Sequence, residues 1–426
     1  MLDKVFAFAI RAVRGWWFAT WTVSCILLLL KYVIVPNFFW LAVIWTGLTA
    51  AWAIIILPAM KNAIWVRNQY IREPPMNIFC DVESAARYDW IEWPHLQLYF
   101  GAVFFMLPRI LGICFILPFG WIMHIVDMYI TGNGNYETEQ PPLWMATKKY
   151  WKPFLMRPLA SWFAIYSVKY KTHKISDYLA DYEKYEKDME GVFAPISICN
   201  HQTGFDMITL LDIFPCLSFL AKIGITKIPS VGVICTRLQS IYIHRGDSSQ
   251  SGVIKEKIKE RCDNIMVHKK RFPSLMIFPE GTTNNARFLM KFKSGAFIQK
   301  VPLQIYGLKY ETSGLNPCLN GYNEPEMFLM NLSNWWCTLA IHTFDTPFDP
   351  RYVADKYGIS MDDEKFWEYF VKETRYLYEY ALGFGQATNG MRQKMEMEES
   401  FGMNMGYEKP ETSVDEIKKK TNIFGR

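Results

Sequence analysis

A histidine and an aspartate with four residues between them, His201 and Asp206, form the first pair in this chain that could do chemistry. A neutral imidazole can remove a hydroxyl proton near pH 7. A carboxylate on its other ring nitrogen fixes the tautomer and stabilises the imidazolium that forms. On one ideal helix the two side chains would point about 140° apart. They can meet only if His201 lies in the turn leaving a strand and Asp206 lies in the first turn of the next helix.

The local sequence is compatible with a catalytic pair and also with a structural role. Residues 192–199 are apolar enough for a buried strand, and Gly204 permits a tight turn before the apolar run that Asp206 opens. In the structural alternative, Asn200 and Thr203 cap the helix, and Asp206 is a first-turn carboxylate that favours its N-terminus. This motif alone does not decide between them.

Two further segments carry groups suited to an anionic ligand. Arg245 ends the apolar run 240–244, where it could make bidentate hydrogen bonds to a phosphate or a surface ion pair. Within the run Phe-Pro-Glu-Gly-Thr, Glu280 can bind an acceptor headgroup or brace the base. Gly281 allows close backbone approach, and Thr282 offers a hydroxyl and an amide to phosphate.

From residue 192 onward, short apolar runs alternate with helical stretches. The runs expected as strands are 192–199, 217–221, 240–244, 275–278 and 301–306, and the main expected helices are 206–214, 252–270 and 362–381. This alternation predicts an α/β fold with a mainly parallel sheet flanked by helices. The stretch 161–190, where tyrosines are mixed with lysines, is expected as an interfacial helix or a surface-covering segment, or else as a solvated helix whose aromatic stripe packs on the core.

The first third of the chain is strongly apolar. Residues 16–35 and 38–59 are each long enough to cross a hydrocarbon core about 30 Å thick, and only Pro36 and Asn37 separate them. We therefore expect a transmembrane helical hairpin. Basic residues flank it on both sides: Lys4, Arg11, Arg14, Lys61, Arg67 and Arg72. The positive-inside rule then places both ends on the cytoplasmic face.

A third apolar stretch, 99–126, contains Pro108, Arg109 and Pro118. A guanidinium near the centre of a bilayer is costly, so we expect a re-entrant or interfacial hairpin bent at 107–109 or at 117–119. The expected regions are a transmembrane hairpin (1–62), a connector with the re-entrant hairpin (63–130), the α/β domain (131–385) and a polar, mobile tail (386–426).

The composition narrows the function classes. The net charge of +5 is small and the aromatic residues are mostly embedded in apolar runs, so nucleic-acid binding is not expected. Nine scattered cysteines without a C-x-x-C indicate reduced thiols, which agrees with a cytoplasmic domain. No G-x-S-x-G occurs, which argues against a serine hydrolase.

Four segments in order resemble the motifs of the glycerolipid acyltransferase family (1-acylglycerophosphate acyltransferase-like). They are Asn-His-Gln-Thr-Gly-Phe-Asp from 200, Ile-Tyr-Ile-His-Arg from 241, Phe-Pro-Glu-Gly-Thr from 278, and Val-Pro-Leu from 301. The run Phe-Lys-Ser-Gly-Ala-Phe from 292 is similar to the lysophosphatidylcholine and lysophosphatidylethanolamine acyltransferase branch. The chain departs from some members in lacking a calcium-binding loop pattern.

The resemblance implies a membrane-bound enzyme that moves a fatty acyl group from acyl-CoA to the free hydroxyl of a lysophospholipid. It implies His201 and Asp206 as the catalytic pair. The implied substrate-binding residues are Asn200, Arg245, Glu280, Gly281, Thr282 and Pro302; Pro302 could instead simply begin a strand. Acyl-CoA would be a substrate rather than a cofactor, no metal is expected, and the implied location is the endoplasmic reticulum.

Other readings remain open at this point. Glycerol-3-phosphate or lysophosphatidate could be the acceptor instead. A metal-dependent lipid hydrolase with His201 and Asp206 as ligands is a remote alternative, because the seven histidines form no H-E-x-x-H or closely spaced ligand set. A membrane-anchored lipid-binding protein without activity is a third.

Overall fold

The computed structural model describes residues 35–72, 95–131, 156–214, 217–227, 231–243, 251–268, 271–312, 315–318 and 324–400. The chain divides into two compact units, Met1–Ala59 and Met60–Arg426.

One long apolar helix, α2 (Val35–Arg72), covers the expected second half of the N-terminal hairpin. Its stretch Phe39–Asn62 has a mean hydropathy of 2.0 and is long and apolar enough to cross a membrane. Pro36 lies in the first turn of α2, where its missing N–H leaves no hydrogen bond unmade. Residues 16–34 lie outside the described residues, so the hairpin itself stays a prediction.

The third apolar stretch is a pair of helices, α4 (His95–Phe104) and α5 (Met106–Thr131), bent by 51°. The bend lies just before the first of the two positions expected for it. Pro108 explains the place: it has no N–H to donate to the carbonyl of Phe104, four residues earlier, and its ring crowds that carbonyl. At Pro118, the second expected position, α5 continues.

Arg109 of α5 is turned into the protein. Its Nη1 donates to the carbonyl oxygens of Leu332 at 2.6 Å and Asn334 at 2.5 Å, and its Nη2 donates to the hydroxyl of Tyr166 at 2.7 Å. These carbonyls are at the C-terminal end of α11 (Glu324–Ser333), where a helix has unpaired acceptors and a partial negative charge. The guanidinium that made a simple membrane span unfavourable therefore anchors the bent pair to α11.

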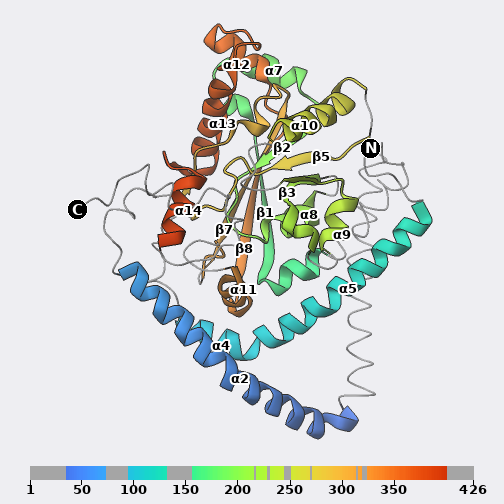
Figure 1. Cartoon of the computed structure of the whole chain (residues 1–426), viewed down its shortest axis with the longest axis vertical. Coiled ribbons are helices and arrows are strands. Elements are labelled where there is room, and N and C mark those ends of the chain that lie inside the picture. Colours follow the sequence, from blue (N-terminus) through green and yellow to red (C-terminus); the bar gives the residue numbers. More distant parts are fainter. Residues whose placement is uncertain are drawn as a thin grey trace. The chain divides into compact units, whose positions relative to one another are not determined.

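The α/β unit is built on a seven-stranded sheet in the order β1-β8-β7-β2-β5-β3-β4 (Figure 1). Its strands are β1 (Ile165–His173), β2 (Ile196–Cys199), β3 (Leu217–Lys222), β4 (Ile241–Ile243), β5 (Ser274–Ile277), β7 (Leu303–Glu311) and β8 (Cys337–Phe344). Neighbouring strands are parallel except β7 and β8, which are antiparallel. The predicted mainly parallel α/β sheet is thus confirmed. The stretch 161–190, expected as a helix or a surface-covering segment, supplies both the edge strand β1 and the short helix α7 (Glu183–Asp188).

Helices and short connections surround this sheet (Figure 1). They include α7 (Glu183–Asp188), α8 (Asp206–Ile213), α9 (Val231–Arg237), α10 (Ser251–Met266), α12 (Pro350–Tyr357) and α13 (Phe366–Leu382). The apolar face of α13 packs on β7 and buries Phe366, Phe370 and Leu377, as its spacing predicts.

The chain after α13 stays in contact with the domain. A two-residue strand, β9 (Gly385–Gln386), pairs with β6 (Phe288–Leu289), and α14 (Met391–Ser400) follows it. Within the region expected as a mobile tail, Gln386 therefore belongs to a strand and residues 391–400 form a helix. Residues 401–426 lie outside the described residues.

Candidate active site

The site begins where β2 ends and its backbone turns away from the sheet. Asn200, the first residue of this turn, bonds through its side chain to Leu308 of the neighbouring strand β7. Its Oδ1 accepts from the backbone N of Leu308 at 2.7 Å, and its Nδ2 donates to the carbonyl of Leu308 at 3.0 Å. Asn200 thus extends the pairing of β2 with β7 by one amide and fixes where the turn starts. Its polar atoms serve the protein rather than a substrate.

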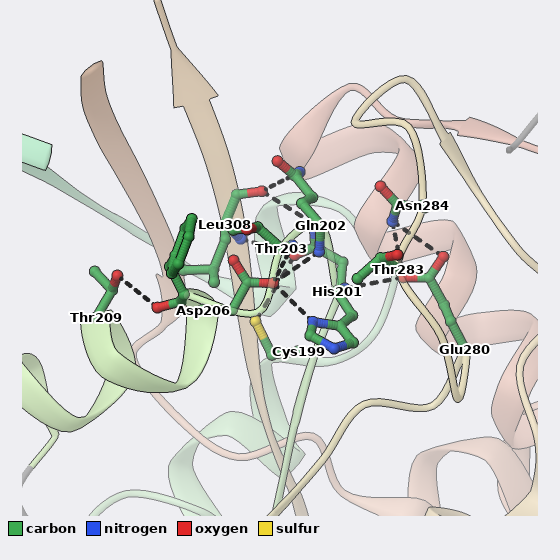
Figure 2. A network of polar contacts seen from close by, with 12 residues as sticks. Cys199, His201, Gln202, Thr203, Asp206, Thr209, Glu280, Thr283, Asn284 and Leu308 are labelled. Atoms are coloured by element: carbon green, nitrogen blue, oxygen red, sulfur yellow. Dashed lines mark hydrogen bonds and ion pairs between the residues drawn. The ribbon is translucent and has the colours of Figure 1, made fainter. Parts of the chain in front are cut away.

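His201 and Asp206 meet directly. His201 lies in the turn after β2 and Asp206 opens α8, the arrangement that their spacing requires. The Nδ1 of His201 is 2.8 Å from Oδ2 of Asp206 (Figure 2). Because a carboxylate can only accept, Nδ1 carries the proton and Nε2 is left as the basic nitrogen.

The Asp206 carboxylate is fully buried and surrounded by donors. Its Oδ2 also accepts from the backbone N–H groups of Gln202 at 2.7 Å and Thr203 at 3.0 Å. Its Oδ1 accepts from the hydroxyl of Tyr310 on β7, at 2.6 Å. These bonds stabilise the ionised carboxylate without solvent. Neither Asn200 nor Thr203 occupies the N-cap position of α8, which is Phe205 and makes no side-chain cap, but Asp206 does lie in the first turn of the helix, as the structural alternative expects.

The ring of His201 stacks on Phe278, with centroids 4.1 Å apart and planes 18° apart. Its side chain is 15% exposed. Within the described part of the chain, Nε2 makes no hydrogen bond. The ring is therefore held by Phe278 and Asp206, while its basic nitrogen remains open to a substrate.

Glu280 holds the same histidine through the backbone. Its buried carboxylate accepts from the N–H of His201 at 3.1 Å, from Nδ2 of Asn284 at 2.8 and 3.0 Å, and from the N–H of Met290 at 2.8 Å. Desolvation by burial raises the pKa of Glu280 to about 7, against the opposing effect of these donors. Of the two roles expected for Glu280, these contacts correspond to bracing the base.

The loop that follows Glu280 is constrained by the backbone conformation of Gly281 and by the contacts of Thr283. Gly281 has φ of +73°, a backbone conformation that favours glycine, and the flexible end of the Lys293 side chain lies beside it. Thr282 is buried. The neighbouring Thr283 accepts at its carbonyl and hydroxyl oxygens from Nζ of Lys394, at 2.7 and 2.8 Å. Lys394 belongs to α14 and is completely buried, which is rare for lysine.

One of the expected site residues, Pro302, is not brought to His201. Pro302 directly precedes β7, whose Leu303 pairs with Ile196 at the start of β2. His201 follows the other end of β2, roughly 20 Å away at the rise of a strand. Arg245 lies outside the described residues. Sequence reasoning missed Tyr310, Asn284 and Lys394, which contact the motif residues from distant parts of the chain.

No group of three or more histidine, cysteine, aspartate or glutamate side chains within the described ranges could hold a metal ion. What the described residues do form is a histidine with a fixed tautomer, an open basic nitrogen and a buried counter-charge. Such a pair can take a proton from a hydroxyl group and return it to a leaving group.

Residues 193–307 match the family model described as Acyltransferase. The chain is 36% identical over 119 residues to lysophospholipid acyltransferase LPEAT1 of Arabidopsis thaliana, covering 26% of this chain and 28% of that protein. It is 28% identical over 180 residues to lysophosphatidylcholine acyltransferase 1 of Homo sapiens, covering 42% of this chain and 30% of that protein. The matched segments thus span about a third or less of these relatives.

Among solved structures, the chain is similar to the 1-acyl-sn-glycerophosphate acyltransferase PlsC from Thermotoga maritima. The identity is 16%, the TM-score is 0.37, and the match covers 65% of this chain and 98% of that one. The sequence matches confirm the resemblance inferred from the four motifs, including the lysophosphatidylcholine and lysophosphatidylethanolamine branch.

Proposed function

We propose that this chain, in which residues 193–307 form an acyltransferase-family domain, transfers a fatty acyl group from acyl-CoA to the free hydroxyl of a lysophospholipid. The observation that carries the proposal is the contact of His201 Nδ1 with Asp206 Oδ2 at 2.8 Å, which leaves Nε2 open. The names of the relatives support a lysophospholipid as the acceptor.

In the proposed reaction, the acceptor hydroxyl donates to Nε2 of His201 and its oxygen attacks the thioester carbonyl. The hydroxyl proton passes to Nε2 as the new C–O bond forms. The tetrahedral intermediate then collapses, the C–S bond breaks, and the CoA thiolate leaves and takes the proton back from Nε2. Asp206 stabilises the imidazolium between these steps. No acyl-enzyme is required.

The remaining motif residues are proposed to divide into two groups. Asn200 and Glu280 position the turn that carries His201, since their polar atoms are bonded to backbone groups of the protein. Gly281 and Thr282 are proposed to approach the phosphate of a substrate, together with Arg245. This division keeps the binding role of the motifs but assigns it to fewer residues than the sequence suggested.

The bent pair α4 and α5 is proposed to lie in a membrane interface without crossing it. Arg109 is directed into the protein, whereas Leu111 and Phe115 on the same helix are exposed. Exposed aromatic residues on the adjoining segment, Trp335 and Trp336, suit the headgroup region of a bilayer. We place the α/β unit on the cytoplasmic face, with the endoplasmic reticulum as the proposed membrane.

The test is acyl transfer by purified protein with labelled acyl-CoA and a panel of acceptors. The panel contains lysophosphatidyl-choline, -ethanolamine and -serine, lysophosphatidate and glycerol-3-phosphate, each with and without a chelator. We expect phospholipid formation from a lysophospholipid, unchanged by the chelator.

Two variants serve as controls for this assay. His201→Ala should lower the rate about 10²–10⁴-fold. Asp206→Asn should lose most of the activity, because an amide can leave His201 in the wrong tautomer. Near-normal turnover by His201→Ala would overturn the mechanism, preference for glycerol-3-phosphate would overturn the acceptor, and chelator-sensitive lipid hydrolysis would overturn the reaction class.

A further inference from the structure

We propose that Tyr310 is a positioning residue that keeps His201 neutral by donating a hydrogen bond to the far oxygen of Asp206. The inference rests on the proposed function, in which neutral His201 is the base. It concerns a residue outside all four motifs, 104 residues away from Asp206.

The contact itself is short and protected from solvent. The Tyr310 hydroxyl lies 2.6 Å from Oδ1 of Asp206. Asp206 is fully buried and Tyr310 is only 5% exposed. The fold creates this contact because β7 pairs directly with β2, so the end of β7 passes beside the turn that leaves β2.

The two carboxylate oxygens of Asp206 have different tasks. Oδ2 accepts from Nδ1 of His201 and from two backbone N–H groups of the turn. Among the described residues, Oδ1 has Tyr310 as its single hydrogen-bond donor. Tyr310 can thus change the electrostatic interaction between Asp206 and the imidazole of His201 without contacting either His201 or a substrate.

The direction of the effect follows from electrostatics. A donor on Oδ1 stabilises the carboxylate and draws part of its charge away from the imidazole. The attraction between Asp206 and the imidazolium form of His201 is then weaker than it would be for a carboxylate without this donor. Removal of the Tyr310 donor should therefore strengthen this attraction and favour the protonated form of His201 relative to the wild type. Burial, followed by the charge of Asp206, raises the pKa of Tyr310 well above its usual value, so the phenol remains a donor.

Other ionisable groups surround the pair but do not replace Tyr310. They are Cys199 on β2, Cys337 on β8, Glu280 in the motif loop, and Tyr378 and Arg375 on α13 behind it. Burial raises the pKa of both thiols, to about 12 for Cys337, so they stay neutral. Glu280 titrates near neutral pH, and its contribution cancels when two proteins that both contain it are compared.

The experiment compares Tyr310→Phe with Tyr182→Phe. Both variants lose one buried phenolic hydroxyl, but that of Tyr182 bonds to the carbonyl of Pro347 and the N–H of Asp349, away from Asp206. Two quantities are measured from pH 5.5 to 9. One is kcat/KM for the acyl transfer. The other is the rate at which diethyl pyrocarbonate acylates His201, read by mass spectrometry of the His201 peptide, because this reagent attacks only the neutral imidazole.

For Tyr310→Phe we expect the midpoints of both curves to rise by about 0.5–1 pH unit. The same shift lowers kcat/KM about three- to tenfold at pH values well below the midpoint, and this loss should disappear well above it. Tyr182→Phe should move neither midpoint. A second variant, with 3-fluorotyrosine at 310, preserves the shape and makes the hydroxyl a stronger donor, so it should lower both midpoints. This variant decides the question if Tyr310→Phe does not fold.

Unchanged or lowered midpoints in Tyr310→Phe, or an unchanged midpoint with 3-fluorotyrosine, would overturn the inference and leave Tyr310 as a packing residue. The acylation curve also separates this failure from failure of the proposed function. If the midpoint for His201 shifts as expected while the wild type shows no acyl transfer, the coupling holds and the assigned activity is wrong.

Discussion

The carboxylate of Glu280 holds His201 by its backbone N–H, at 3.1 Å, and leaves the imidazole ring to Asp206. The backbone carbonyl of His201 is held in turn by the N–H of Asn284, at 2.6 Å. Both contacts cross about eighty residues of sequence and join the loop after β5 to the turn after β2. The two motifs therefore form one structural unit around the base.

Replacing Glu280 by glutamine should lower kcat while leaving KM nearly unchanged. A glutamine offers one accepting oxygen and one N–H group, so one of the three donors around Glu280 would face another donor. Opposing or unsatisfied buried polar groups cost about 1–3 kcal/mol, and we expect a fall in kcat of roughly tenfold. Steady-state kinetics with the preferred acceptor checks this. A raised KM with an unchanged kcat would return Glu280 to a substrate-binding role.

The same carboxylate should make stability depend on pH. Its pKa in the folded protein is raised to about 7 by burial, so the folded state binds the proton more tightly than the unfolded chain. Its contribution to stability is full below the ordinary glutamate pKa, about 4.3, and is lost as the pH rises to about 7. Relative to Glu280→Gln, the wild type should therefore lose melting temperature between pH 5 and pH 8. A relative gain over this range would mean that the surrounding donors outweigh burial.

Lys394→Met should reduce kcat by about three- to tenfold. The buried ammonium donates to the carbonyl and hydroxyl of Thr283, next to the Asn284 that holds His201. Without it, the loop loses its link to α14. Arg392→Met is the matched control, because Arg392 is exposed on the same helix and pairs with Glu396, also on α14. An unchanged kcat with a raised melting temperature would show that Lys394 is only a costly buried charge.

The sequence predicted the parts of the site that depend on neighbouring residues. The strand, the turn at Gly204 and the helix opened by Asp206 lie within eighteen residues, and together they dictate that His201 and Asp206 meet. Tyr310 and Lys394 could not be found in the same way. Nothing near Lys394 marks it as buried, since α14 is otherwise polar, and the contact of Tyr310 depends on the pairing of β7 with β2.

The fold was predictable to a similar extent. The sequence predicted β2, β3, β4, β5 and β7, whereas β8 and the edge strand β1 were not predicted. Lys169, Lys171 and Tyr170 of β1 are exposed, so the strand lacks a continuous apolar run. At an edge, exposed lysines also discourage pairing with another chain. The composition that hid the strand therefore agrees with its place in the sheet.

Arg109→Met should destabilise the α/β unit by about 2–4 kcal/mol, because the carbonyls of Leu332 and Asn334 would lose a charged donor in a buried setting. Thermal unfolding in detergent measures the effect. Leu111→Ala, on the same helix but exposed, should change stability by less than about 0.5 kcal/mol. Equal effects of the two substitutions would show that Arg109 does not anchor the helix pair.

Phe115→Ala should weaken the binding of the bent pair to membranes without changing stability. Phe115 is 72% exposed, and burying an aromatic side chain of this size contributes about 1.5–3 kcal/mol. Both proteins are full-length and carry polar substitutions in α2, so that this apolar helix does not dominate the binding to membranes. Flotation on phosphatidylcholine vesicles is then compared with and without Phe115→Ala. The native sequon at Asn331 cannot replace this measurement as a reporter of membrane position. Its side chain is buried at the end of α11 and donates to the carbonyl of Pro317, so the absence of a glycan there would be uninformative. Unchanged flotation of Phe115→Ala would mean that the exposed face of α5 does not enter the bilayer.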